Sequence, residues 1–252
     1  MIGEWDGLGW LIVFTVALIY LQRRLHFETQ TLFFLLTKRT DLALALFSLL
    51  FFPGVILHEV SHYVMARLLQ VKTGKFSLLP HPLPDGRLRL GFVETSSTDV
   101  LRDALIGIAP LAVGGAFVGY AALFPLGLPL FWEGARSWGW QDLLLSLRTL
   151  PARPDFWVWF YLTFAVSSTM MPSASDRRAW LPVIALFAVL VSIAALAGAG
   201  PWLLQNVAPQ INRAFKAVAA VFGISASIHL VLVIPLWTFR SLMMKVMGLS
   251  FG

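Results

Sequence analysis

The sequence predicts an all-α polytopic membrane protein, with about six transmembrane helices and a small membrane-surface β-hairpin. Of the 252 residues, 58% are hydrophobic and only 13% are charged, whereas a soluble domain carries about 25% charged residues. Apolar runs of about 20 residues, long enough to cross a bilayer, recur along the chain. The chain has no cysteine, so any transition-metal site must use histidine and carboxylate ligands.

The spans fall into three segments of the chain. Residues 1–40 hold a span at about Leu8 to Leu21 and a short apolar interfacial segment, Thr31 to Leu36. The first run lacks a basic leader and a small-residue cleavage site, so we interpret it as a span and not a signal peptide. Residues 41–178 form the core, with spans at about Asp41 to Leu69, Ala104 to Phe124 and Phe156 to Met171. Residues 179–252 hold two C-terminal spans, about Ala179 to Leu203 and Val218 to Trp237, the last preceded by an amphipathic stretch, Ile211 to Ala217.

The connections within the core differ from each other. The loop at 125–154 carries tryptophans typical of a membrane interface. Residues 73–95 predict the hairpin, because Leu88, Leu90 and Phe92 alternate with polar residues or glycine, the period of a half-buried strand. Pro84-Asp85-Gly86 is a turn signal, and Lys75 to Leu78 is the expected partner strand. In the second span, Pro53-Gly54 predicts a kink.

The net charge of +6 does not indicate a nucleic-acid partner. The basic residues stand singly or in pairs at the ends of apolar runs, where Lys and Arg anchor helices at the membrane interface. We therefore expect the lipid bilayer as a partner and no nucleic acid. The charges leave the orientation undecided, because alternating spans put ten basic residues on one side and nine on the other.

The second span contains His58-Glu59-Val60-Ser61-His62. Two histidines four residues apart share one helix face and can reach one metal ion. Glu59 lies about 100° around the helix, where it could take a proton from an activated water and pass it to a leaving amine. Ionisable residues cost about 2.5–3.5 kcal/mol each at mid-bilayer, so three of them within an apolar span indicate a function. The alternative is an interfacial polar cluster, because Arg67 lies near the end of the span.

Catalytic zinc needs a third protein ligand and one open position. We expect Asp176 to be that ligand, because it follows a span, comes after Pro172 and is preceded by small residues. The alternative for Asp176 is an N-cap of the next helix. Weaker candidates are Asp99 and Asp103, which we expect at the start of a helix, and Glu94 on the hairpin. His81 in a turn and His229, expected to be hydrogen-bonded inside the bundle, are also weaker.

Together these residues resemble the site-2 protease family of intramembrane zinc metalloproteases. The resemblance covers roughly residues 45 to 180 and rests on the motif at 58–62, the hairpin and the aspartate after a proline. It implies that His58, His62 and Asp176 bind Zn²⁺, that Glu59 is the general base, and that the hairpin presents an extended membrane protein or peptide substrate. It also implies a multi-pass protein of the cell membrane whose active site faces the cytoplasm.

The chain departs from that family at three places. Thr169-Met170-Met171-Pro172 replaces an Asn-Leu-Leu-Pro-like stretch, Arg177 replaces the glycine after the aspartate, and the third span lacks an asparagine after Pro110. A polar helper for the oxyanion is therefore missing, and Arg177 or Ser168 are candidates to replace it.

Three alternatives compete with a site-2-type protease. A catalytically inactive pseudo-protease that binds membrane partners would fit the missing asparagine. A metal or proton transporter would use His58, His62 and His229, but the charged residues form one cluster and not a chain across the bilayer. The prenyl-protein proteases need a downstream glutamate ligand, and no glutamate follows Glu133. The substrate and the oligomeric state do not follow from the sequence.

Overall fold

The computed structural model describes residues 6–78, 80–82, 88–96, 98–136 and 140–248, so the predicted turn Pro84-Asp85-Gly86 lies outside the described residues. Its helices are α1 (Gly7–Thr37), α2 (Thr40–Leu68), α3 (Val100–Leu123), α4 (Leu128–Arg136), α5 (Trp140–Thr149), α6 (Phe156–Thr169), α7 (Trp180–Ala194), α8 (Gly200–Trp202) and α9 (Ala208–Val246). A 3₁₀ turn (Leu150–Ala152) precedes α6, and π-helical turns (Ala195–Ala199 and Leu203–Val207) flank α8. The strands are β1 (Thr73–Ser77), β2 (His81–Pro82), β3 (Leu88–Arg89) and β4 (Phe92–Thr95).

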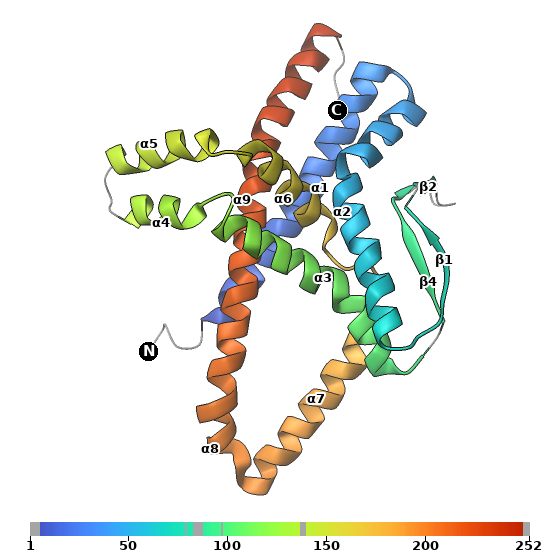
Figure 1. Cartoon of the computed structure of the whole chain (residues 1–252), viewed down its shortest axis with the longest axis vertical. Coiled ribbons are helices and arrows are strands. Elements are labelled where there is room, and N and C mark those ends of the chain that lie inside the picture. Colours follow the sequence, from blue (N-terminus) through green and yellow to red (C-terminus); the bar gives the residue numbers. More distant parts are fainter. Residues whose placement is uncertain (1–5, 79, 83–87, 97, 137–139, 249–252) are drawn as a thin grey trace.

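Within the described residues, 4 helical stretches are long and apolar enough to cross a membrane: Gly7–Thr37, Thr40–Leu68, Val100–Leu123 and Trp180–Val246. They are consistent with the expected all-α membrane protein. The expected fourth span forms α6, whose 14 residues are shorter than the roughly 20 that cross a bilayer. The expected fifth and sixth spans lie in one helical stretch that reverses near α8 (Figure 1), beside Gly198 with its positive φ of 92°. A count of about six therefore stays a prediction.

Helix α1 runs through both the first expected span and the expected interfacial segment. The polar residues between them do not end the helix, because Glu28 is buried and ion-paired. Arg24 lies 2.8 Å from one carboxylate oxygen of Glu28, and Arg240 of α9 contacts the other. A buried carboxylate is tolerated when it is paired in this way.

Helices α1 and α9 lie side by side and run parallel (Figure 1). At their N-terminal ends, Lys216 pairs with Asp6 at 2.5 Å, and the Gly7 N–H donates to Asn212 Oδ1 at 2.8 Å. At the other end, Arg240 pairs with Glu28. The first and last long helices are thus joined at both ends.

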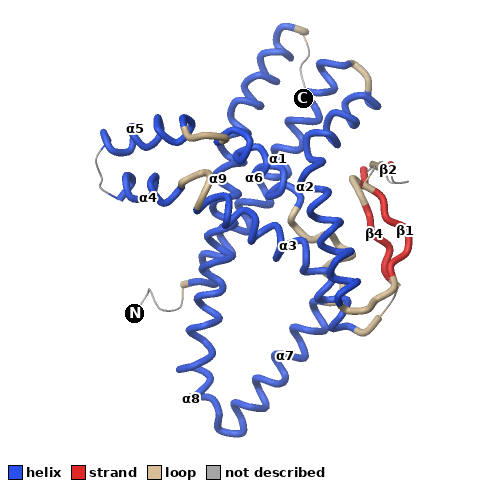
Figure 2. The backbone as a smooth tube through the Cα atoms, viewed as in Figure 1, coloured by secondary structure: helices blue, strands red, loops and turns tan. Residues whose placement is uncertain are grey.

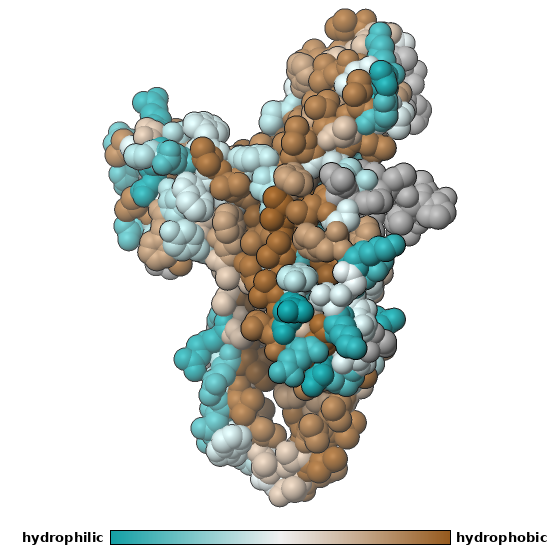
Figure 3. Space-filling view, turned by 45° about the vertical axis from the view of Figure 1, so that its right-hand side comes forward, coloured by the Kyte–Doolittle hydropathy of each residue, from teal (hydrophilic) through white to brown (hydrophobic). Residues whose placement is uncertain are grey.

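The core draws on helices from every part of the chain. One buried cluster joins α1, α3, α6 and α9 through Leu18, Val118, Val166, Met170, Phe222 and Ala226. A second joins α1, α2, α6 and α9 through Leu25, Phe47, Phe51, Phe164 and Ile228. Hydrophobic side chains also cover much of the visible surface (Figure 3), and no residue of α7 is buried. An apolar surface of this extent suits contact with lipid.

The expected loop at 125–154 differs from the structure, which forms α4 and α5 there. The two short helices stand away from the bundle (Figure 2). They begin after a tight turn at Gly127, where φ is 65° and a Cβ would lie 2.5 Å from Arg153 Nη1. The Arg153 guanidinium donates to the carbonyls of Phe124 and Pro125, each at 3.2 Å. These hydrogen bonds hold the turn and the start of α6 together.

The expected hairpin is present. Strands β1 and β4 pair antiparallel, with Phe76 opposite Val93 and Ser77 opposite Phe92, and β2 pairs with β3 beyond them. The predicted continuous strand is broken at Gly91, which packs against α2. A Cβ there would lie 2.9 Å from Glu59 Cγ, so the absence of a side chain permits this contact.

Helix α2 continues through Pro53 and approaches α6 closely at Gly54. A Cβ at Gly54 would lie 2.2 Å from the carbonyl oxygen of Ala165. Small residues at such points let helices pack tightly in lipid.

We predict that Gly54→Ala destabilises the protein by about 1–3 kcal/mol, because the added methyl group forces two backbones apart. The measurement is the thermal unfolding midpoint in detergent. The control is Gly9→Ala on α1, where a Cβ meets no described atom within 4 Å and the midpoint should hold or rise. Equal midpoints for the two variants would contradict the tight contact.

Candidate metal centre

Helix α2 presents His58 and His62 on the same face, as their spacing predicts. Their side chains are 14% and 10% exposed. The two rings meet edge to face, with centroids 4.9 Å apart. Both Nε2 atoms lie beside the same carboxylate, that of Asp176.

Asp176 lies in the turn segment between α6 and α7, which we call the ligand loop (residues 170–179). Its Oδ1 is 3.4 Å from His62 Nε2, and its Oδ2 is 3.9 Å from His58 Nε2. One ligand atom from each of the three residues lies within 4.8 Å of the others. Donor atoms around a tetrahedral zinc ion, with bonds of about 2.0–2.2 Å, lie about 3.4 Å apart. The His62–Asp176 separation already has this length, so the three residues could hold a metal ion such as zinc once the wider separations close.

Hydrogen bonds orient two of these three candidate ligands. His62 Nδ1 lies 2.9 Å from the carbonyl oxygen of Ile106, and donating to it leaves the Nε2 lone pair directed at Asp176. The Asp176 carboxylate accepts from the Ser173 backbone N–H at 2.7 Å and from the Ser173 hydroxyl at 2.6 Å. Burial alone would raise the pKa of Asp176, but its contacts with His62 and Ser173 outweigh burial and hold the pKa well below its usual value. The carboxylate is thus ionised, as a metal ligand must be.

The alternative interpretation of Asp176 as a helix N-cap is wrong. Helix α7 begins at Trp180, and Ala179 occupies the N-cap position. Asp176 lies further upstream, and its side chain accepts hydrogen bonds from Ser173 in its own loop.

Residues on one face of α3 contact His62 and the ligand loop that carries Asp176. Ile106 supplies the carbonyl that orients His62. Gly107 lies against the ligand loop so closely that a Cβ would be 2.1 Å from the Asp176 carbonyl oxygen. One turn earlier, Asp103 pairs with Arg178 at 3.6 Å.

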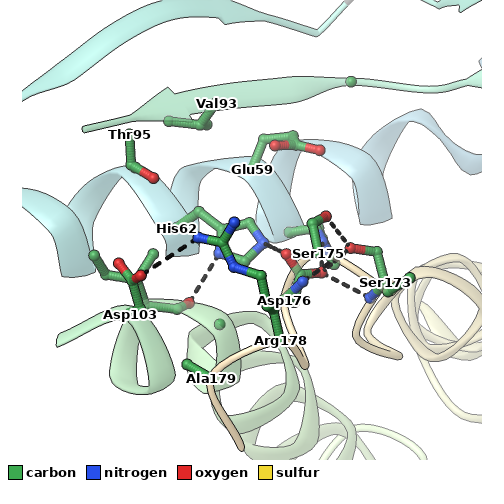
Figure 4. A pocket seen from close by; sticks show the side chains of 15 residues that line it. Glu59, His62, Val93, Thr95, Asp103, Ser173, Ser175, Asp176, Arg178 and Ala179 are labelled. Carbon is green, nitrogen blue, oxygen red and sulfur yellow. Dashed lines mark hydrogen bonds and ion pairs between the residues drawn. The ribbon is translucent and has the colours of Figure 1, made fainter. Parts of the chain in front are cut away.

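These side chains open onto one cavity of about 680 Å³, shown in Figure 4. Glu59 also lines the cavity and is 8% exposed. In Figure 4 it lies between α2 and β4, on the side where Val93 projects. The complete lining is His58, Glu59, His62, Gly91, Val93, Thr95, Asp103, Ile106, Gly107, Ser173, Ala174, Ser175, Asp176, Arg178 and Ala179.

The weaker candidates whose side chains the structure describes have other partners. Asp99 caps α3 by accepting from the Arg102 N–H at 3.0 Å, as expected for a helix-start residue. His229 is buried and hydrogen-bonded, as expected, to Ser168 at 2.8 Å and to the Ser225 carbonyl at 2.7 Å. Glu94 lies on β4, where it accepts from the Lys75 N–H at 3.2 Å. His81 lies in β2, and its side chain is outside the described residues.

Sequence reasoning did not identify Ile106, Gly107, Ser173 or Arg178 as parts of this site. Ser173 carried a usable signal, because a serine three residues before an aspartate can donate to its carboxylate in a tight turn. The other three depend on the packing of α3 against the ligand loop.

Comparisons of the chain with protein-family models, with curated proteins and with solved structures find no match.

We predict that the detergent-purified protein binds about one zinc ion and that His58→Ala and Asp176→Ala each lose it. Elemental mass spectrometry of the three proteins is the measurement. Asp99→Ala removes a carboxylate outside the cavity and should keep the zinc. Zinc retained in Asp176→Ala would place the third ligand elsewhere.

We also predict that Gly107→Ala lowers zinc affinity by about 10–100-fold, the usual cost of disturbing a ligand's support, because the methyl group displaces the Asp176 backbone. Competition with a chelator measures the affinity. Gly119→Ala on the same helix, where a Cβ meets no described atom within 4 Å, is the control. An unchanged affinity in Gly107→Ala would show that this contact does not position the ligand.

Proposed function

We propose that the protein is an intramembrane zinc metalloendopeptidase, similar to the site-2 proteases, that cleaves a peptide bond in or near a transmembrane segment of another protein. The observation that supports this best is the convergence of His58, His62 and Asp176 within 4.8 Å in a cavity that Glu59 also lines. This arrangement combines a three-ligand metal site with a carboxylate beside it, as metal-assisted hydrolysis requires.

In this proposal His58, His62 and Asp176 hold the zinc, which when bound activates water and polarises the scissile carbonyl. Glu59 accepts a proton from the attacking water as the carbon–oxygen bond forms. It then delivers that proton to the amine as the carbon–nitrogen bond breaks. The near-complete burial of Glu59 keeps bulk water from competing for the proton.

The geometry of β4 supports delivery of an extended substrate. β4 pairs with β1 along one edge, and its residues Val93 and Thr95 line the cavity. A peptide that pairs with the other edge of β4 through main-chain hydrogen bonds would lie along the cavity beside Glu59. A helical substrate must unwind first, since helix formation occupies its carbonyls.

The candidate membrane-spanning helices support a membrane protein as substrate, because α2 carries both the apolar surface and the motif. By resemblance, the protein would be a multi-pass protein of the cell membrane with about six spans and an active site that faces the cytoplasm. The lipid bilayer and a membrane protein substrate are then its partners.

We predict that Glu59→Gln abolishes cleavage but keeps zinc, because the amide cannot accept the proton and the three ligands remain. The expected loss is at least about 100-fold. The measurement is cleavage of a labelled transmembrane peptide in detergent, with zinc content measured in parallel. Glu133→Gln on α4, outside the cavity, is the matched control and should remain active.

Cleavage that persists in Glu59→Gln would exclude this residue as the base. Zinc binding without cleavage in the wild type, across a panel of transmembrane peptides, would favour the pseudo-protease.

A further inference from the structure

The proposed hydrolysis places negative charge on the scissile carbonyl oxygen. Enzymes of this chemistry stabilise that charge with preorganised donors in addition to any metal. The sequence offers Arg177 and Ser168 as candidates for this donor.

The structure excludes both candidates. Arg177 is exposed, its Nε donates to the Ser173 carbonyl at 3.2 Å, and it is not part of the cavity lining. Ser168 is 2% exposed and hydrogen-bonded to His229 inside the bundle. Neither side chain faces a peptide bound beside the histidines.

Arg178, the residue after Arg177 in the ligand loop, lines the cavity that the histidines and Asp176 share. It is the one arginine or lysine among the described residues that line the cavity. In Figure 4 its side chain extends from the ligand loop toward Asp103, whereas Glu59 lies against β4. The Asp103 carboxylate contacts Nη2 at 3.6 Å, and a guanidinium carries further N–H donors that this contact does not use.

The exposure of these two side chains fits a guanidinium that is anchored but still accessible. The Asp103 side chain, in the first turn of α3, is 23% exposed, whereas that of Arg178 is 77% exposed. Bound substrate would exclude water from this region, and a charge-assisted hydrogen bond strengthens when it is desolvated.

We propose that Arg178 donates a hydrogen bond to the developing oxyanion of the scissile peptide, with Asp103 as the residue that positions its guanidinium. This inference rests on the proposed protease function. The ligand loop then has two functions at positions two residues apart: Asp176 binds the metal, and Arg178 stabilises the negative charge.

The test compares wild type, Arg178→Ala, Arg178→Lys and Arg102→Ala by steady-state cleavage of one labelled transmembrane peptide, with zinc content and unfolding midpoint measured for each. We expect Arg178→Ala to lower kcat by about 100-fold with KM within about threefold, and with zinc content and midpoint unchanged. Arg178→Lys should recover part of kcat, because it keeps a cationic donor. Arg102→Ala removes an exposed arginine in the first turn of α3 that does not line the cavity, so it should match the wild type.

A kcat for Arg178→Ala within about twofold of Arg102→Ala would overturn the proposal, as would a defect confined to KM. Loss of zinc or of stability in Arg178→Ala would also overturn it, because the residue would then support the fold. Failure of the proposed function is distinguishable, because the wild type itself would then bind zinc and cleave no peptide.

Discussion

The close approach of α3 to the ligand loop is the contact on which the candidate metal centre depends. At Gly107 the loop backbone occupies the space where a side chain would stand. The carbonyl oxygen of the preceding residue, Ile106, accepts a hydrogen bond from His62, although that carbonyl lies within a helix. Carbonyl oxygens have two lone pairs, so this one can accept from the imidazole and from its own helix. Helix α3 and the ligand loop, which are distant in sequence, thus both contact the helix that carries the histidines. Because backbone atoms make these contacts, the positions of the candidate ligands depend little on side-chain rotation.

The same apolar setting makes every buried polar group costly unless it is paired. Glu28 meets this constraint with arginines from two helices. His229 meets it with a hydroxyl and a backbone carbonyl, which leaves no ring nitrogen for a metal. The candidate centre is different in kind. His58 Nε2 faces a carboxylate across 3.9 Å, a distance too long for a hydrogen bond. Polar side chains whose hydrogen-bonding atoms are only partly paired with other protein groups can bind a cation within an apolar bundle.

Local rules predicted the parts of this protein that depend on spacing within one element. The i, i+4 histidines, the Asp99 cap and the two paired strands of the hairpin, β1 and β4, appear where those rules put them. The rules failed where a partner lies far away in the chain. Nothing near Glu28 indicates that a residue of α9 neutralises it, so α1 was divided into a span and an interfacial segment. The same limit applies to the ligand loop. Adjacent arginines are equivalent in sequence, and only the fold directs Arg177 back to its own loop and Arg178 into the cavity.

The parallel pairing of α1 with α9 also constrains the order in which the chain can complete its structure. The hydrogen bond from Gly7 to Asn212 joins residues 205 positions apart, so it cannot form until most of the chain has been synthesised. Of the two arginines that neutralise Glu28, only Arg24 belongs to the same helix. Until α9 packs against α1, the Glu28 carboxylate therefore has an arginine contact at only one of its two oxygens. The structure around α1 is therefore complete only once α9 has returned to it and Arg240 has paired with Glu28.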